Sequence, residues 1–228
     1  MSELGIAWLR GVLAADNVTM TDFQAALLER YVELLRAHNA VVNLISRKDT
    51  DGVWLHHILH SLSLLAVVPP PRDASFIDVG TGGGLPGIPL AIMLPDARFT
   101  LVDSIGKKVR AVVDMIESLG LPNAFALNGR VDELARGGKL PGDIDIVLAR
   151  AVAPLDDLVS WARPLLRTGM QCTLCAWKGG DLSREIDVAR RRAWVASIEE
   201  FPIRLSAEST LEQEQKKLVR VALQAAST

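Results

Sequence analysis

The stretch Ser75-Phe-Ile-Asp-Val-Gly-Thr-Gly-Gly-Gly-Leu-Pro-Gly87 decides the fold of this chain, because it joins an apolar strand-like run to a glycine-rich turn and the start of a helix. Glycine reaches positive φ without strain at Cβ and lets the backbone approach a ligand closely. The helix that follows presents free N–H groups and the positive end of its dipole to the polar or anionic end of a ligand. The stretch is therefore typical of a loop that binds a nucleotide-like cofactor.

The glycine pattern of this turn is compatible with two classes of cofactor. Taken literally, Gly82-x-Gly84-x-x-Gly87 satisfies the dinucleotide pattern, in which the first glycine comes immediately after the strand. In this chain the residue immediately after the strand is Gly80. If the dinucleotide pattern starts there, Leu85 stands at the position of its third glycine. The dinucleotide interpretation is weakened but stays open.

Two acidic residues bear on the choice. Asp78 lies at the end of the first strand-like run and is followed by G-x-G-x-G, which looks like the first motif of class I S-adenosylmethionine-dependent methyltransferases. Asp103 ends the next strand-like run, and an acidic residue roughly 20 residues further on can bind ribose hydroxyls in either class. Because strand, turn, helix and acid coincide, we favour a cofactor loop over a simple tight turn.

Length and composition predict a soluble globular protein. The 228 residues suffice for one good-sized domain, or a domain with a small extension, and 49% hydrophobic with 23% charged residues is ordinary. The longest apolar run, around residues 62–68, is too short to span a bilayer, and the first residues lack the basic start of a secretory signal. We therefore expect no membrane association and a cytoplasmic protein.

Charge and metal-ligand patterns give weak signals. The net charge of −2 argues against bulk electrostatic coating of nucleic acid, although basic clusters such as Lys107, Lys108 and Arg110 leave a local basic face possible. Cys172 and Cys175 lie in a strand-like run and are expected to be buried thiols. Three histidines at 56, 57 and 60 have helical spacing but no clear acidic partner, so no metal site is expected.

The order of elements predicts two parts. Helical periodicity over 21–38 and 54–68, ended by three prolines at 69–71, predicts an N-terminal helical extension over residues 1–72. From 73 to 228, strand and helix patterns alternate, which predicts βαβ crossovers and a parallel sheet. The expected strands are 75–79, 98–103, 124–127, 144–149, 171–177, 195–201 and 218–223, and the expected helices are 86–94, 107–119, 155–166 and 182–192. No helix is expected between the last two strands, so these are predicted to be antiparallel.

Short motifs along the chain carry a resemblance to a known family. They are His38-Asn39, Asn43-Leu44-Ile45-Ser46, His57-Ile58-Leu59-His60-Ser61, residues 78–89, Leu101-Val102-Asp103-Ser104, Gly129-Arg130-Val131-Asp132-Glu133, Ala149-Arg150-Ala151 and Lys178-Gly179. With them the chain resembles the ribosomal RNA small subunit methyltransferase G family, also called glucose-inhibited division protein B, over most of its length.

The resemblance implies a fold and an activity. The implied fold is the α/β, Rossmann-like fold of class I S-adenosylmethionine-dependent methyltransferases, with a mostly parallel seven-stranded sheet and an N-terminal helical extension. The implied activity is transfer of a methyl group from S-adenosylmethionine to N7 of a guanine in a hairpin loop of 16S ribosomal RNA near the decoding centre. The expected partner is 16S ribosomal RNA or the small ribosomal subunit; oligomeric state is open, with a monomer favoured.

The resemblance also implies roles for single residues. Gly80 and Leu85 would line the cofactor, Val131 and Asp132 would flank its adenine, and Arg150 would contact cofactor or substrate. By analogy with the class, Asp103 would hold the ribose hydroxyls. The expected cofactor-binding residues are Asp78, Gly80, Gly82, Gly84, Leu85, Asp103, Val131, Asp132 and Arg150.

The chain departs from the family pattern at two positions. His60 stands where the family usually has Asp, and His56 stands where it usually has Arg, so an ionic role of these positions is in question. His57 and Ser61 match the pattern.

The chemistry of the implied reaction limits which residues can matter. N7 of guanine carries an in-plane lone pair and no proton, so methyl transfer needs no general base. We therefore expect substrate-positioning residues, with Arg130, Arg150 and Asn39 as candidates, because guanidinium groups grip phosphate or guanine O6 and asparagine can bind a base edge or cap a helix. A dinucleotide-dependent oxidoreductase and a non-catalytic RNA-binding assembly protein remain as alternatives.

Overall fold

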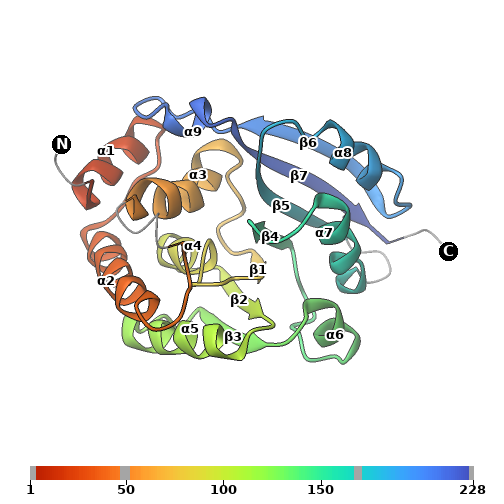
Figure 1. Ribbon diagram of the computed structural model, residues 1–228, viewed down its shortest axis with the longest axis horizontal. Helices are drawn as coiled ribbons and strands as arrows, with labels where there is room; N and C mark the ends of the chain where they lie inside the picture. Colours follow the sequence, from red (N-terminus) through yellow and green to blue (C-terminus); the bar gives the residue numbers. More distant parts are fainter. Residues whose placement is uncertain (1–3, 47–51, 167–170, 226–228) are drawn as a thin grey trace.

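A seven-stranded sheet runs through the structure in the order β3-β2-β1-β4-β5-β7-β6 (Figure 1). The structure is a computed structural model that describes residues 4–46, 52–166 and 171–225. The strands are β1 (Ser75–Val79), β2 (Arg98–Asp103), β3 (Ala124–Asn128), β4 (Ile146–Arg150), β5 (Gln171–Gly179), β6 (Val195–Pro202) and β7 (Lys216–Gln224). The first five strands are parallel to one another, whereas β7 is antiparallel to both β5 and β6. The predicted sheet and its antiparallel terminal pair are confirmed.

The order of the strands reverses at β1. The chain moves outward from β1 through β2 to β3, then returns to place β4 on the other side of β1. All parallel strands end at the same edge, so the residues that follow them meet there. In open α/β sheets this reversal opens a crevice for a ligand.

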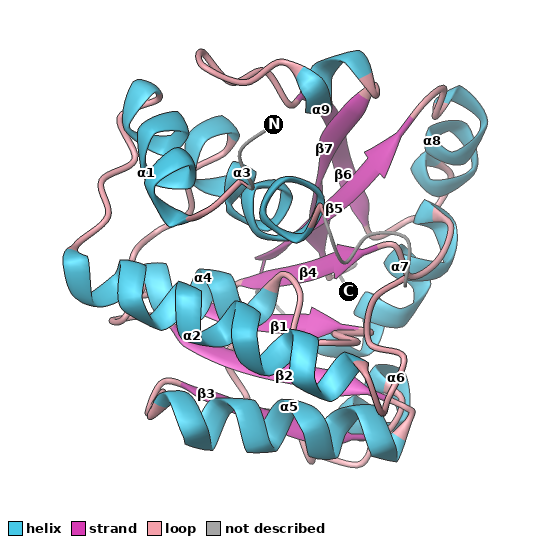
Figure 2. Ribbon diagram, turned by 60° about the vertical axis from the view of Figure 1, so that its left-hand side comes forward, coloured by secondary structure: helices cyan, strands magenta, loops and turns pink. Residues whose placement is uncertain are grey.

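Helices cover both faces of the sheet (Figures 1 and 2). Side chains alternate along each strand, so Phe76 and Phe99 belong to one core and Ile77 and Val102 to the other. The first face carries α1 (Ile6–Ala15), α2 (Asp22–Asn39), η2 (Val53–Leu59), α3 (His60–Val67), α4 (Gly87–Met93) and α5 (Gly106–Leu119). The second carries α6 (Val131–Arg136), α7 (Leu155–Ala162), η3 (Arg163–Leu165) and α8 (Ser183–Arg190).

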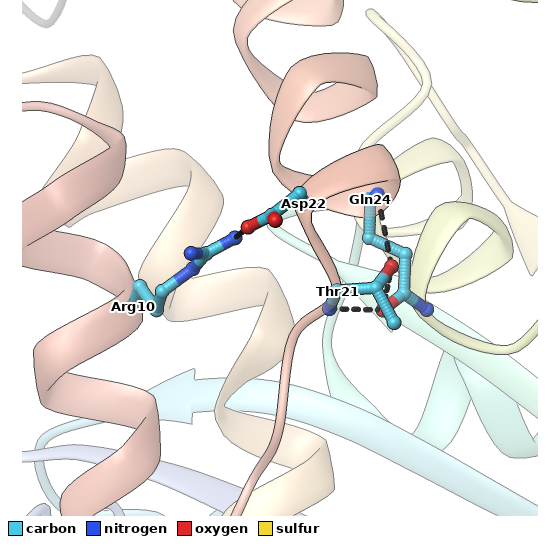
Figure 3. Close-up of polar contacts among 4 residues, drawn as sticks. All are labelled: Arg10, Thr21, Asp22 and Gln24. Atoms are coloured by element: carbon cyan, nitrogen blue, oxygen red, sulfur yellow. Dashed lines mark hydrogen bonds and ion pairs between the residues drawn. The ribbon is translucent and has the colours of Figure 1, made fainter.

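Helix α2 begins with a capping box that also ties it to α4. Thr21 Oγ1 accepts from the Gln24 N–H at 3.2 Å, and Gln24 Oε1 accepts from the Thr21 N–H at 2.9 Å (Figure 3). The amide nitrogen of Gln24 donates to Ile92 O at 3.2 Å. Arg10 and Asp22 form an ion pair between α1 and α2 (Figure 3), but both are exposed and the pair contributes little.

Some elements differ from the prediction. The helix expected over 54–68 is a π-helix, η2, which continues as α3. The helix expected over 155–166 leaves α-geometry at Ala162, because Pro164 cannot donate the next backbone hydrogen bond and a 3₁₀ turn follows. The expectation of no helix between the last two strands was wrong, since α9 (Thr210–Gln213) lies there. One turn is too short to show periodicity.

The two cysteines are buried on β5, as predicted. Cys172 and Cys175 are 4% exposed and free. Burial raises the pKa of both thiols to about 12, so both remain protonated.

In the described part of the chain, no helix has both the length and the apolar character needed to cross a membrane.

The N-terminal helices share one core with the sheet. Leu9, Leu28 and Leu35 belong to the same buried cluster as Phe76 and Phe99. The boundary at residue 72 stays a prediction, but α2 packs directly on the glycine turn that follows β1. The fully buried Tyr31 donates its hydroxyl to Gly83 O at 2.8 Å, and burial holds the pKa of Tyr31 well above its ordinary value.

Replacing Tyr31 should therefore weaken the fold. In Tyr31→Phe the buried Gly83 carbonyl loses its donor, and we expect the free energy of unfolding to fall by about 1–3 kcal/mol. Urea denaturation followed by circular dichroism measures the change. Phe23→Leu, on an exposed position of the same helix, is the control and should change the free energy of unfolding by less than about 0.5 kcal/mol. Equal stability of Tyr31→Phe and the unmodified protein would contradict this role.

Candidate cofactor and substrate site

A cavity opens at the carboxyl ends of the parallel strands, where the strand order reverses. Its wall includes Gly80 after β1, Asp103 at the end of β2 and residues 129–132, which follow β3 and begin α6. Residues 151–152 after β4 and Trp161 of α7 close the opposite side. Five of the predicted site residues meet in this wall: Gly80, Asp103, Arg130, Val131 and Asp132.

The glycine turn has the backbone conformation that its sequence predicts. Gly80 has φ +68° and Gly82 has φ +58°, values that L side chains rarely adopt. A Cβ on Gly80 would lie 2.8 Å from Val152 Cγ1, so the turn passes close to the loop after β4. Gly84 lies in the same turn, while Leu85 is buried in the core beneath it.

Asp78 holds the turn from below. It is 1% exposed, and its Oδ2 accepts from Thr81 Oγ1 at 2.6 Å and from the Gly87 N–H at 3.0 Å. Burial raises the pKa of Asp78 to about 6, against the stabilising effect of both hydrogen bonds on the carboxylate. Asp78 therefore joins the two ends of the turn and lies behind the cavity wall.

Asp103 connects the turn to the end of β2. Its Oδ2 accepts from the Gly82 N–H at 3.0 Å and its Oδ1 accepts from the Ile105 N–H at 2.9 Å. Each carboxylate oxygen can accept more than one hydrogen bond, so Asp103 keeps acceptor capacity at the cavity wall. A ligand hydroxyl is the kind of donor that fits this position.

Arg130 and Asp132 form the polar side of the wall. Arg130 precedes α6, and its Nε lies 3.3 Å from Asp132 Oδ1. Asp132 also pairs with Arg136 one turn further along α6. The Arg130 guanidinium lies 5.9 Å from the centre of the Trp161 ring. Trp161 was not predicted as a site residue, because its place in an amphipathic helix does not reveal that its ring faces the cavity.

Arg150 is not among the residues that line the cavity, and its guanidinium contacts η2 instead. Its Nη1 donates to His56 O at 3.2 Å and its Nη2 lies 3.1 Å from His57 Nδ1, both on η2. The next residue, Ala151, does line the cavity and has φ +56°, a strained value for a residue with a Cβ. Arg150 therefore joins the N-terminal helices to the loop that closes the site.

Asn39 is buried rather than presented to a substrate. It is 6% exposed, and its Oδ1 accepts from the Leu44 N–H at 2.8 Å and the Ile45 N–H at 3.0 Å. These bonds fold the segment after α2 onto the glycine turn, where a Cβ on Gly83 would lie 3.2 Å from Leu44 Cβ. A direct role of Asn39 in holding a substrate stays a prediction.

Among the described residues, no group of three His, Cys, Asp or Glu side chains has metal-site geometry.

The buried Asp78 carboxyl should make stability depend on pH. Because its pKa is about 6 in the folded protein and 3.8 when unperturbed, the unfolded chain ionises first as pH rises. The free energy of unfolding should therefore fall between about pH 4 and about pH 6, by about 3 kcal/mol from this group. Urea denaturation of Asp78→Asn across this range should lack that fall. Parallel pH profiles of the variant and the unmodified protein would refute it.

Comparisons with known proteins agree with this geometry. A family model described as rRNA small subunit methyltransferase G matches residues 24–216. The ribosomal RNA small subunit methyltransferase G of Chlorobium luteolum is 44% identical over 194 residues, which is 85% of this chain and 78% of the relative. That of Chlorobaculum tepidum is 41% identical over 200 residues, covering 86% and 89%.

The solved structures confirm the fold class. Aeropyrum pernix fibrillarin, crystallised with natively bound S-adenosyl-L-methionine, superimposes with a TM-score of 0.52 at 14% identity, over 72% of this chain and 73% of that one. The predicted class I methyltransferase fold is thereby confirmed, and the match to the family extends over most of the chain. The chain belongs to the rRNA small subunit methyltransferase G family.

Proposed function

We propose that this protein transfers the methyl group of S-adenosylmethionine to N7 of a guanine in a decoding-region hairpin loop of 16S ribosomal RNA. Its substrate is this RNA or the small ribosomal subunit, and it acts as a monomer in the cytoplasm. The observation that carries the proposal is the cavity at the strand reversal, whose wall combines Gly80, Asp103, Val131 and Asp132 in a chain of this family. Membership of the family favours this function over the oxidoreductase and the non-catalytic alternatives.

The cavity wall suits the methyl donor. Asp103 offers carboxylate oxygens to ribose hydroxyls, and the turn from Gly80 to Gly84 lets the backbone approach the ligand closely. Val131 and Asp132, at the start of α6, would flank the adenine. When bound, the donor supplies a methyl group on a sulfonium that leaves as a neutral thioether.

The protein's contribution to the reaction is alignment. The N7 lone pair forms the new bond to the methyl carbon as the carbon–sulfur bond breaks, and the sulfur keeps the bonding electrons. No proton moves in this step. Holding N7 in line with the methyl group at near-attack distance can therefore lower the activation barrier by about 7 kcal/mol. Arg130 is suited to hold the RNA, because it lies in the wall and its side chain is half-exposed.

A basic surface beside the cavity suits the RNA backbone. Lys107, Lys108 and Arg110 lie in the first turns of α5, and Lys108 reaches the cavity wall. Within residues 4–46, 52–166 and 171–225, none of these three cations pairs with an acid. By contrast, Arg30 pairs with Glu33 and Arg204 pairs with Glu212. Phosphate groups are the natural partners of the α5 cations.

Methyl transfer itself is the first test. Ribosomal RNA from cells that lack the protein should gain methyl groups from labelled S-adenosylmethionine, and the modified strand should break at one guanine after borohydride and aniline treatment. RNA from cells that contain the protein is the control and should gain little, because its site is already methylated. No incorporation into either naked RNA or small subunits would overturn the proposed function.

Gly80→Ala tests the cofactor site. A Cβ there would meet Val152, so we expect the affinity for S-adenosylhomocysteine to fall at least about tenfold in calorimetric titration. Gly120→Ala is the matched control, since Gly120 also has positive φ but nothing within 4 Å of its added Cβ. It should lose stability and keep the affinity. Equal losses of affinity for S-adenosylhomocysteine in the two variants would argue against this site. Protection of the unmodified protein against thermal unfolding by NAD and not by S-adenosylhomocysteine would also argue against it.

The salt dependence of RNA binding tests the basic surface. Removing two phosphate contacts in Lys107→Gln/Arg110→Gln should lower the slope of log affinity against log salt by about 1.4 for a single-stranded loop. Arg30→Gln/Arg204→Gln removes the same charge from cations that are already paired, so its slope should stay close to that of the unmodified protein. Fluorescence anisotropy with a labelled hairpin measures both, and indistinguishable slopes would count against the surface.

A further inference from the structure

The contact between Arg150 and His57 joins the helical layer to the wall of the proposed methyl-donor site. Arg150 is the last residue of β4, and its two terminal nitrogens reach the His56 carbonyl at 3.2 Å and His57 Nδ1 at 3.1 Å. Ala151, the next residue, is in the cavity wall with φ +56°. A strained residue of this kind keeps its conformation only where neighbouring contacts hold it.

The chemical state of His57 follows from its surroundings. The side chain is buried, and burial, followed by the positive charge of Arg150, lowers the pKa of His57 to about 3. The imidazole is therefore neutral at physiological pH. A guanidinium has only donors, so His57 Nδ1 must be the acceptor and Nε2 must carry the proton.

The helix that presents His57 is itself fixed to the sheet. Residues 53–59 form a π-helix, a geometry that is rare and often found at functional sites. One residue beyond it, His60 O accepts from Trp177 Nε1 at 2.6 Å. Trp177 lies on β5 directly opposite Arg150 in the parallel register. The acceptor for Arg150 is thus held at a fixed distance from the strand that carries Arg150.

We propose that His57 is a positioning residue, which accepts a hydrogen bond from Arg150 and thereby fixes the Ala151 segment of the cavity wall in the conformation that binds the methyl donor. The inference rests on the proposed function for the identity of that donor. It assigns a task to a histidine that takes no part in proton transfer. It also predicts that His57 acts through Arg150 and not independently of it.

A double-mutant cycle with S-adenosylhomocysteine as the probe tests this coupling. We expect His57→Leu and Arg150→Ala each to weaken binding about tenfold, and the double variant to bind within about twofold of Arg150→Ala alone. His57→Asn keeps an acceptor near the position of Nδ1 and should restore affinity to within about threefold of the unmodified protein. Thermal unfolding of each variant establishes that it is folded.

His60→Leu is the matched control. His60 has the same 8% exposure as His57, lies three residues further along, and its pKa is also lowered to about 3 by burial. Within the described residues, His60 is not part of the cavity wall and its Nε2 has no hydrogen-bond partner, so any loss of affinity should add in full to that of Arg150→Ala. If His57→Leu weakened binding only by damaging the packing of the core, its loss of affinity would likewise add in full to that of Arg150→Ala.

The outcomes separate the two levels of the proposal. Full additivity of His57→Leu and Arg150→Ala, or no rescue by His57→Asn, would overturn the positioning role. An unchanged affinity in Arg150→Ala would overturn it as well. Because the cycle uses S-adenosylhomocysteine and no RNA, failure of the RNA methylation assay would remove the proposed substrate and leave the result of the cycle standing.

Discussion

The hydrogen bonds that two acidic residues accept from the glycine turn are the interactions on which the rest of the site depends. Asp78 ties Thr81 to Gly87, and Asp103 accepts from Gly82. The turn needs positive φ, which the unfolded chain has no reason to prefer, so its conformation must be fixed by partners. The two carboxyls lie near the carboxyl ends of neighbouring parallel strands, because Asp78 is opposite Leu101 in the register and Asp103 follows Leu101 by two residues. The Asp103 carboxylate also lines the cavity, and its oxygens can accept further hydrogen bonds from a ligand.

A second set of contacts fixes the turn from the helical side. Tyr31 donates to Gly83 O, and Asn39 folds the segment after α2 against the turn. Arg150 extends this connection to the loop after β4 through His57. The N-terminal helices therefore do more than cover the sheet, because they hold both walls of the cavity. A site used for alignment rather than proton transfer depends on such rigid support.

Much of this architecture could be predicted from the sequence. The frame of Gly80 relative to Asp78 identified the cofactor loop, and the apolar runs located the strands because their period and length are distinctive. The directions of Arg150 and Trp161 could not be predicted, since they depend on contacts with residues about 90 and 30 positions away. Asn39 shows the same limit, because its buried acceptor role is decided by the fold of a later segment.

The central claim is that the cavity at the strand reversal holds the methyl donor. A crystal structure of the protein with S-adenosylhomocysteine tests it most directly. We expect the ligand to lie between the turn after β1 and the start of α6, with its ribose hydroxyls on Asp103 and its adenine beside Val131. Occupancy of a different cavity, or a ribose that makes no contact with Asp103, would contradict the account.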